Sequence, residues 1–199
     1  MALVHEEDVA WVESKQGSVF ENRRRRLGRA AGSEELGCCL TEVPPGKTAW
    51  PFQAHLGNEE AIYVLRGRAT LRLGDARHAL KPGDYVALRA SAEAAHQVIN
   101  TGDETFAYLA MSTMNPTDVV LYPDSGKRGV FAGGAPGAAS RTLTAFTPEE
   151  ADVEYWEGEP VGPDPDAPAA AAAEAAIEQQ VDDELEAMKR RLSLEGDGD

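Results

Sequence analysis

Residues 51–67 read PFQAHLGNEEAIYVLRG, and residues 83–100 read GDYVALRASAEAAHQVIN. Successive side chains of a strand point to opposite faces, so Gln53 and His55 share one face. A carboxylate follows after a short turn, and a second histidine comes on a later strand. Two imidazoles and a carboxylate are typical ligands of a divalent transition metal. We therefore expect a group of polar side chains to meet inside the fold: Gln53, His55, Glu60 and His96.

Residues 36–113 consist of short apolar or alternating runs separated by Gly, Pro and Asp turns, without a long segment of helical periodicity. Many short strands at this spacing are typical of a β-sandwich or barrel. A chain of 199 residues is long enough for one such domain with appendages. The predicted strands are 36–43, 61–65, 69–73, 85–88, 96–100 and 105–112.

The first stretch resembles the first motif of the cupin superfamily, which runs Gly, His-x-His, three or four residues, Glu, six residues, Gly. Here Gly46 precedes Gln53 and His55, four residues separate His55 from Glu60, and six separate Glu60 from Gly67. The sequence departs from the motif at Gln53, which replaces the first histidine.

The second stretch resembles the second cupin motif, which runs Gly, five residues, Pro-x-Gly, two residues, His, three residues, Asn. Gly83, His96 and Asn100 match it, whereas Arg89 and Ser91 replace Pro and Gly, and the loop is two residues longer. The resemblance covers about residues 36–113. It implies an all-β fold, a double-stranded β-helix (jelly-roll) barrel.

The resemblance also implies a metal centre, because the family carries its metal on the positions that match these residues: His55, Glu60, His96 and Gln53. The expected cofactor is a divalent metal, namely Fe, Mn, Ni or Zn. A neutral amide is a weaker ligand than imidazole, so Gln53 should lower the affinity. The alternative is a barrel without metal, in which the histidines and the glutamate only hydrogen-bond one another and a ligand.

Two kinds of function follow from the resemblance. One is a metal-dependent enzyme that acts on a small organic metabolite by oxygenase, isomerase or decarboxylase chemistry. The other is a non-catalytic module that binds or senses a sugar or another small molecule. The fold hosts both kinds, and the motifs contain no further convincing general acid or base. A mostly apolar pocket is expected from the inward positions Ile62, Val64 and Val98, with Trp50, Phe52, Tyr63 and Met111 as further candidates, Tyr63 being on the wrong face if alternation is strict.

Three segments flank the predicted barrel. Residues 1–35 form an N-terminal arm with edge strands, and their basic run Arg23–Arg26 could bind an anion or the acidic tail. We favour an exposed edge strand whose charges discourage edge pairing. Residues 114–160 should wrap over the barrel. Cys38 and Cys39 are neighbours, so a disulfide between them would be strained, and we expect reduced packing residues.

Residues 161–199 should form a linker, an alanine-rich helix over 169–192 and a disordered end. Residues 149–199 hold 17 acidic and 3 basic side chains, which leaves 17 acidic and 16 basic ones for residues 1–148. The acidity therefore belongs to the tail, and it argues against nucleic acid as a partner. The helix has one apolar stripe, which should pack on the barrel or on a second copy: Ile177, Val181, Leu185, Met188 and Leu192.

The sequence contains no apolar run of the roughly 20 residues that a membrane span needs, and its N-terminus lacks the order of a secretory signal. We therefore expect a cytoplasmic protein with no membrane partner. The expected partners are a small-molecule ligand and a second copy of the chain, since dimers through barrel edge strands are common among cupin-like proteins.

Overall fold

The structure is a computed structural model that describes residues 3–160, 162 and 169–195. The chain divides into two compact units, Met1–Asp152 and Val153–Asp199. Most of the predicted linker (161–168) and the predicted disordered end beyond residue 195 lie outside the described residues.

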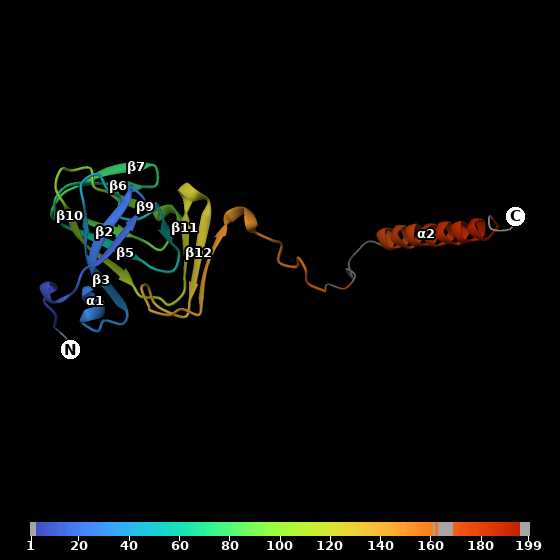
Figure 1. The fold of residues 1–199 in the computed structure, drawn as a ribbon, viewed down its shortest axis with the longest axis horizontal. Helices are drawn as coiled ribbons and strands as arrows, with labels where there is room; N and C mark the ends of the chain where they lie inside the picture. Colours follow the sequence, from blue (N-terminus) through green and yellow to red (C-terminus); the bar gives the residue numbers. More distant parts are fainter. Residues whose placement is uncertain (1–2, 161, 163–168, 196–199) are drawn as a thin grey trace. The chain divides into compact units, whose positions relative to one another are not determined.

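The first unit is almost entirely β-structure, and its described strands form three hydrogen-bonded groups (Figure 1). The largest has the order β1 (Val12–Gln16), β2 (Phe20–Arg25), β3 (Leu36–Val43), β10 (Phe106–Thr113), β5 (Glu60–Arg66) and β8 (Tyr85–Leu88). The second has the order β13 (Leu143–Pro148), β12 (Lys127–Ala132), β11 (Asp118–Tyr122) and β4 (Ala54–His55). The third has the order β7 (Ala76–Leu80), β6 (Ala69–Leu73) and β9 (His96–Ile99).

Short helical turns lie between some of these strands, before the first and after the last. The α-helix α1 (Leu27–Ala30) follows β2. Single 3-10 turns lie at Glu6–Asp8, Ala92–Ala94, Pro123–Ser125 and Glu149–Ala151.

The arrangement confirms the predicted all-β jelly roll, in which strands far apart in the sequence are neighbours in a sheet. The central strand β10 pairs antiparallel with both β3 and β5, so that Leu109 lies opposite Leu40 on one side and Tyr63 on the other. The bounds of β3, β6 and β8 match the predicted strands. Strand β7 was not predicted, because four of its five residues are exposed and it shows no apolar alternation.

The prediction of an exposed edge strand at Arg23–Arg26 is wrong. These arginines fall in β2 and the residue after it, and β2 pairs with β1 on one side and β3 on the other. The edge strands of this sheet are β1 and β8 instead. Charged side chains on an inner strand need another explanation than protection of an edge.

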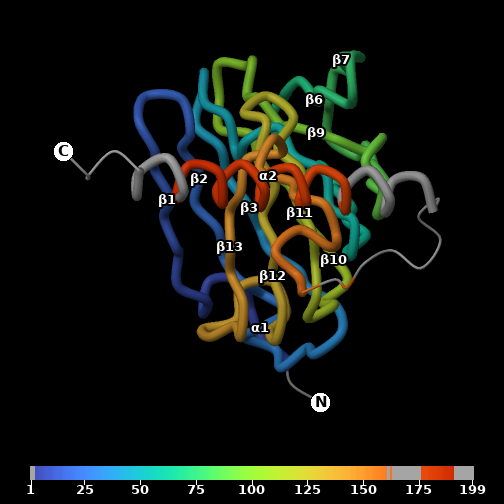
Figure 2. Tube along the Cα trace, turned by 90° about the vertical axis from the view of Figure 1, so that its right-hand side faces the viewer, coloured from blue at the N-terminus to red at the C-terminus, as the bar shows by residue number. Residues whose placement is uncertain are grey.

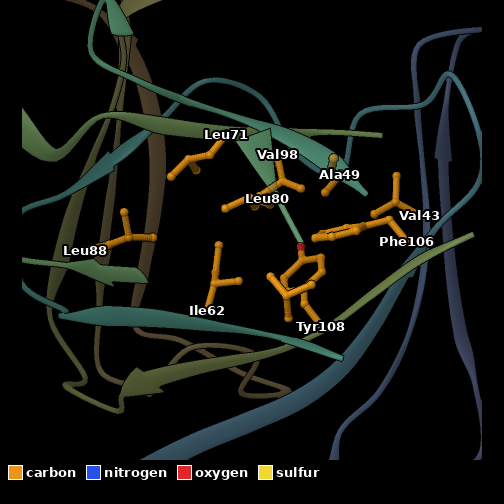
Figure 3. Packing of buried hydrophobic residues seen from close by; sticks show 11 residues of the cluster. Val43, Ala49, Ile62, Leu71, Leu80, Leu88, Val98, Phe106 and Tyr108 are labelled. Atoms are coloured by element: carbon orange, nitrogen blue, oxygen red, sulfur yellow. The ribbon is translucent and has the colours of Figure 1, made fainter. Parts of the chain in front are cut away.

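The core lies between the sheets and consists of apolar side chains from almost every strand of the barrel. Val43, Val64 and Phe106 are fully buried, and Phe106 lies against Tyr108 with ring centroids 5.4 Å apart. Figure 3 shows Ile62 and Val98 near the two aromatic rings and Leu88 on the far side of Ile62 in the same cluster. Burial of this surface is the main favourable term in folding.

The chain after β10 adds a sheet of its own to the barrel. Strands β11, β12 and β13 run antiparallel side by side (Figure 2), and β11 pairs with β4 so that Val120 lies opposite His55. The extension is therefore hydrogen-bonded to the strand that carries the first motif.

The second unit contains the predicted helix, α2 (Ala169–Glu195). The described members of its apolar stripe are exposed: Ile177, Val181, Leu185 and Met188. No helix in the described ranges has the length and hydropathy that a membrane span requires.

Candidate functional site

The four predicted site residues come from three neighbouring backbone segments. His55 ends β4 and Glu60 begins β5, so the short turn between these strands holds the two residues close together. Gln53 and His96 form an antiparallel bridge, in which each backbone N–H donates to the other residue's carbonyl at 3.1 and 2.8 Å. The bridge and the turn bring all four side chains to one place.

The side chains meet around one carboxylate oxygen. Glu60 Oε2 lies 3.2 Å from His96 Nε2 and 3.6 Å from His55 Nε2. Gln53 Nε2 lies 3.3 Å from His55 Nε2. The side chains of His96, His55 and Glu60 are only 11, 17 and 26% exposed. The structure thus brings together every residue that the motifs select as a ligand.

A buried aspartate of the extension holds His55. Asp118 Oδ2 lies 2.6 Å from His55 Nδ1 and also accepts a hydrogen bond from Asn58 Nδ2 at 2.9 Å. Its other oxygen accepts from the Gly57 backbone N–H at 2.8 Å. A Cβ atom at Gly57 would lie 2.5 Å from the Thr117 carbonyl oxygen, so only glycine allows this close approach. Asp118 is therefore a fixed partner for the imidazole.

The outer hydrogen bonds decide which nitrogen of each imidazole carries a proton. His55 Nδ1 faces the Asp118 carboxylate, and His96 Nδ1 lies 3.0 Å from the Ala94 carbonyl oxygen. Both partners only accept, so each Nδ1 must donate. In the neutral imidazoles the Nε2 lone pairs then face Glu60. Two lone pairs and a carboxylate repel one another unless a proton or a cation lies between them.

The donor set fits a divalent metal by its chemistry. Two Nε2 atoms and a carboxylate match the ligands of transition-metal centres, and a carboxylate behind a histidine is the usual outer partner of such a ligand. As placed, the side chains contact one another directly, and within the described ranges no group of three or more His, Cys, Asp and Glu is spaced to hold an ion. Gln53 completes the ring with an amide in place of a third imidazole.

Comparison with known proteins agrees with this geometry. The model of the cupin domain matches residues 39–112. A structure from Acidithiobacillus ferrooxidans, named as a candidate sugar phosphate isomerase, is 30% identical over 67% of this chain and 80% of its own, with a TM-score of 0.61. This chain belongs to the cupins.

Two further solved structures share the fold. A cupin-superfamily sugar phosphate isomerase from Silicibacter pomeroyi is 23% identical and has a TM-score of 0.64, over 75% of this chain and 94% of its own. The polyketide cyclase RemF from Streptomyces resistomycificus is 24% identical and has a TM-score of 0.50, over 57% of this chain and 79% of its own. The comparison with curated proteins gives no match.

Mutual contacts shift the pKa values of the cupin site. Burial acts to lower the pKa of His55, but the hydrogen bond with Asp118 and the charge of Glu60 outweigh it and raise that pKa. Burial acts to raise the pKa of Glu60 and of Asp118, but their histidine partners outweigh it and lower both. The site therefore favours carboxylates facing a positive charge.

A cavity of about 250 Å³ opens on the four ligand candidates. Its apolar wall includes four of the predicted pocket residues: Trp50, Ile62, Val98 and Met111. Val64 and Phe52 are buried in the core instead, and Tyr63 is 40% exposed, as its position on the outer face predicts. Beside the four ligand candidates, the lining includes the polar residues Arg24, Gln97 and Tyr108, so the cavity is more polar than predicted. Apolar walls with convergent polar groups are typical of sites for small organic ligands.

Several residues near the site have roles that the motifs do not give. Asn100 is fully buried and donates to the Val43 and Glu104 carbonyl oxygens, so it holds the backbone and is no ligand. Tyr108 lines the cavity, and burial raises its pKa, so its phenol stays protonated. Cys38 and Cys39 are free thiols.

Sequence reasoning missed Asp118 and Tyr108. An acidic residue before the apolar run of β11 is a weak signal, because it also marks an ordinary strand start. Tyr108 could have been found by the alternation of β10, which places it on the face of Phe106 and Ala110.

Proposed function

We propose that this cupin binds a divalent metal ion through His55, Glu60 and His96, with Gln53 beside them, and acts on a small organic ligand in the adjoining cavity. When bound, the ion would polarise an oxygen-bearing group of that ligand. The chain's own residues would orient the ligand, exclude water and hold protons. The cavity has a volume of about 250 Å³ and a partly apolar wall, which suits one small molecule.

One observation carries the proposal: two imidazole Nε2 atoms, which the outer partners make acceptors when the rings are neutral, face one carboxylate at 3.2 and 3.6 Å. A divalent cation relieves this repulsion without changing either tautomer. Protonation of the imidazoles relieves it too, and it is the state expected for a cupin that binds its ligand without metal.

The relative that is 30% identical is named as a candidate sugar phosphate isomerase. Isomerisation of a phosphorylated sugar is accordingly the first activity to assay. Tyr108 lines the cavity with a buried, protonated phenol whose hydroxyl already has Thr41 as its hydrogen-bond partner.

The test is metal analysis of protein purified without chelator, followed by titration of the stripped protein with Fe(II), Mn(II), Ni(II) and Zn(II). We expect one ion per chain and a rise in the melting temperature with the preferred metal. A stripped protein that binds none of the four ions, and melts at the same temperature with and without them, would refute the metal and support the binding module.

A further inference from the structure

A second cavity, of about 330 Å³, adjoins the candidate metal ligands on the side of β2. It shares part of its wall with the first cavity, namely Arg24, Trp50, Glu60, Ala110, Met111 and Pro136. A ligand of moderate size can therefore lie against Glu60 at one end and reach the arginines at the other.

Arg24 is the charged residue common to both cavities besides Glu60. Its guanidinium lies over the Trp50 ring, 4.8 Å from the centroid, and its Nε is buried without a hydrogen-bond partner. No described residue forms an ion pair or hydrogen bond with it. The stacking on Trp50 leaves the hydrogen-bond donors of this half-buried cation unused, which is costly unless another group accepts from them.

The next residue along β2 toward the N-terminus is a control within the structure. Arg23 lies on the opposite face of the strand and pairs with the buried Glu42 at 2.7 Å. Arg25 also has a buried Nε without a partner, but it packs on Trp11 and lines neither cavity. The fold thus neutralises Arg23 and leaves Arg24 open to the cavity.

Two more arginines line the larger cavity next to Arg24. Arg26 and Arg29 both donate from Nη1 to the Gly137 carbonyl oxygen, at 3.5 and 3.0 Å. Burial, and then the charge of Arg26, lower the pKa of Arg24, so the local potential is positive. The carboxylates of this wall are Glu34 and Glu60, and the second of these faces the histidines.

We propose that Arg24, assisted by Arg26, is a binding site for an oxyanion, a carboxylate or a phosphate monoester, carried by the ligand whose other end reaches Glu60. The inference rests on the proposed function, since it names the chemical class of the ligand that would occupy these two adjoining cavities. A planar guanidinium held by aromatic stacking donates two parallel hydrogen bonds to such an anion.

The experiment follows the side-chain Nε–H signals of the arginines by NMR while the full chain is titrated with inorganic phosphate, acetate or glycerol. The Arg24 signal is assigned by its loss in Arg24→Lys. We expect it to move and saturate with an anion, and to stay in place with the neutral glycerol. The anion that binds more tightly identifies a phosphate ester or a carboxylate as the ligand group.

Variants then locate the site. We expect Arg24→Gln to raise the dissociation constant of the more tightly bound anion by about 10- to 100-fold. Arg26→Gln should raise it less, and Arg24→Lys should keep the charge but lose the paired geometry. Arg77→Gln is the matched control, because Arg77 is exposed on β7 and lines neither cavity; it should leave the constant within twofold.

The inference is overturned if no anion moves the Arg24 signal, or if Arg24→Gln binds the anion as tightly as wild type does. Should Arg24→Gln fail to fold, Arg24→Lys and Arg26→Gln carry the test, and unchanged binding in both overturns it. Metal content is measured in parallel. Anion binding without metal refutes the proposed metal centre alone, whereas metal binding without anion binding refutes the arginine site alone.

Discussion

The two adjoining cavities, with a histidine end and an arginine end, differ in how their charges are balanced. At the histidine end, Glu60 contacts both imidazoles and Asp118 contacts one of them, so every charged group has a partner within the protein. At the arginine end, Arg24 has no such partner among the described residues. This difference is consistent with the two proposals, a cation held at the first end and an anion of the ligand bound at the second.

The largest effect is expected at the histidine end, where metal binding should depend on the imidazoles. Replacing His96 by Ala removes a ligand and the contact with Glu60. We expect metal content to fall from about one ion per chain to the background of the assay. His78→Ala is the matched control, because His78 is exposed on β7. Full metal content in His96→Ala would refute the ligand assignment.

A smaller loss is expected when the outer partner is changed. Asp118→Asn keeps the shape but removes the charge that fixes the His55 tautomer. Metal affinity should fall by about 10- to 100-fold, measured by competition with a chromogenic chelator. The control is Asp103→Asn, since Asp103 is exposed in a turn after β9. Equal affinities in the two variants would mean that Asp118 has a structural role only.

The charge balance at the histidine end also predicts a pH dependence for the metal-free protein. The pKa values of Glu60 and Asp118 are lowered. These carboxylates therefore contribute fully to the free energy of unfolding above their ordinary pKa values of 4.5 and 3.8. That contribution is lost as the pH falls through the lowered pKa values. The pKa of His55 is raised, so its contribution is complete below 6.5 and is lost as the pH rises through the shifted value.

The metal-free melting temperature should therefore be highest between pH 4.5 and 6.5 and should fall by about 2–5 °C on the alkaline side. Differential scanning calorimetry measures it. His55→Ala should flatten the alkaline decline, and a decline of the same size in that variant would assign it to other groups.

The smallest effect should come from the tail. Removing residues 161–199 leaves the first compact unit, Met1–Asp152, complete. We expect metal content and anion affinity to stay the same and the melting temperature to change by less than about 2 °C. The mass in solution tests the proposed homodimer, because an unchanged dimer would place the contact on the barrel and a monomer would place it on the stripe of α2.

The sequence predicted the barrel well because its signals are local. Turns such as Lys81–Asp84 and the alternation of β6 depend on neighbouring residues, so β3, β6 and β8 were placed with their bounds. The ligand candidates were also found, since their spacing within two motifs is local. Their convergence on Glu60 follows from the bridge between Gln53 and His96.

The remaining features depend on pairing between distant segments. Asp118 reaches His55 only because β11 pairs with β4, and no periodicity reveals that pairing. Arg24 was interpreted with its neighbours as part of an edge strand, because alternation does not tell which strand covers β2. Its face toward the cavity, and the lack of a partner that distinguishes it from Arg23, appear only in three dimensions.

Asp118 and the loop Ala135–Ala138 both lie beyond residues 39–112, the part that defines the family. One fixes the imidazole of His55, a proposed metal ligand, and the other lines the space next to the arginines. Changes in the extension could therefore alter which ligands the cavity accepts. A protein engineer could exchange this loop to accept bulkier or differently charged compounds while leaving the two cupin motifs untouched.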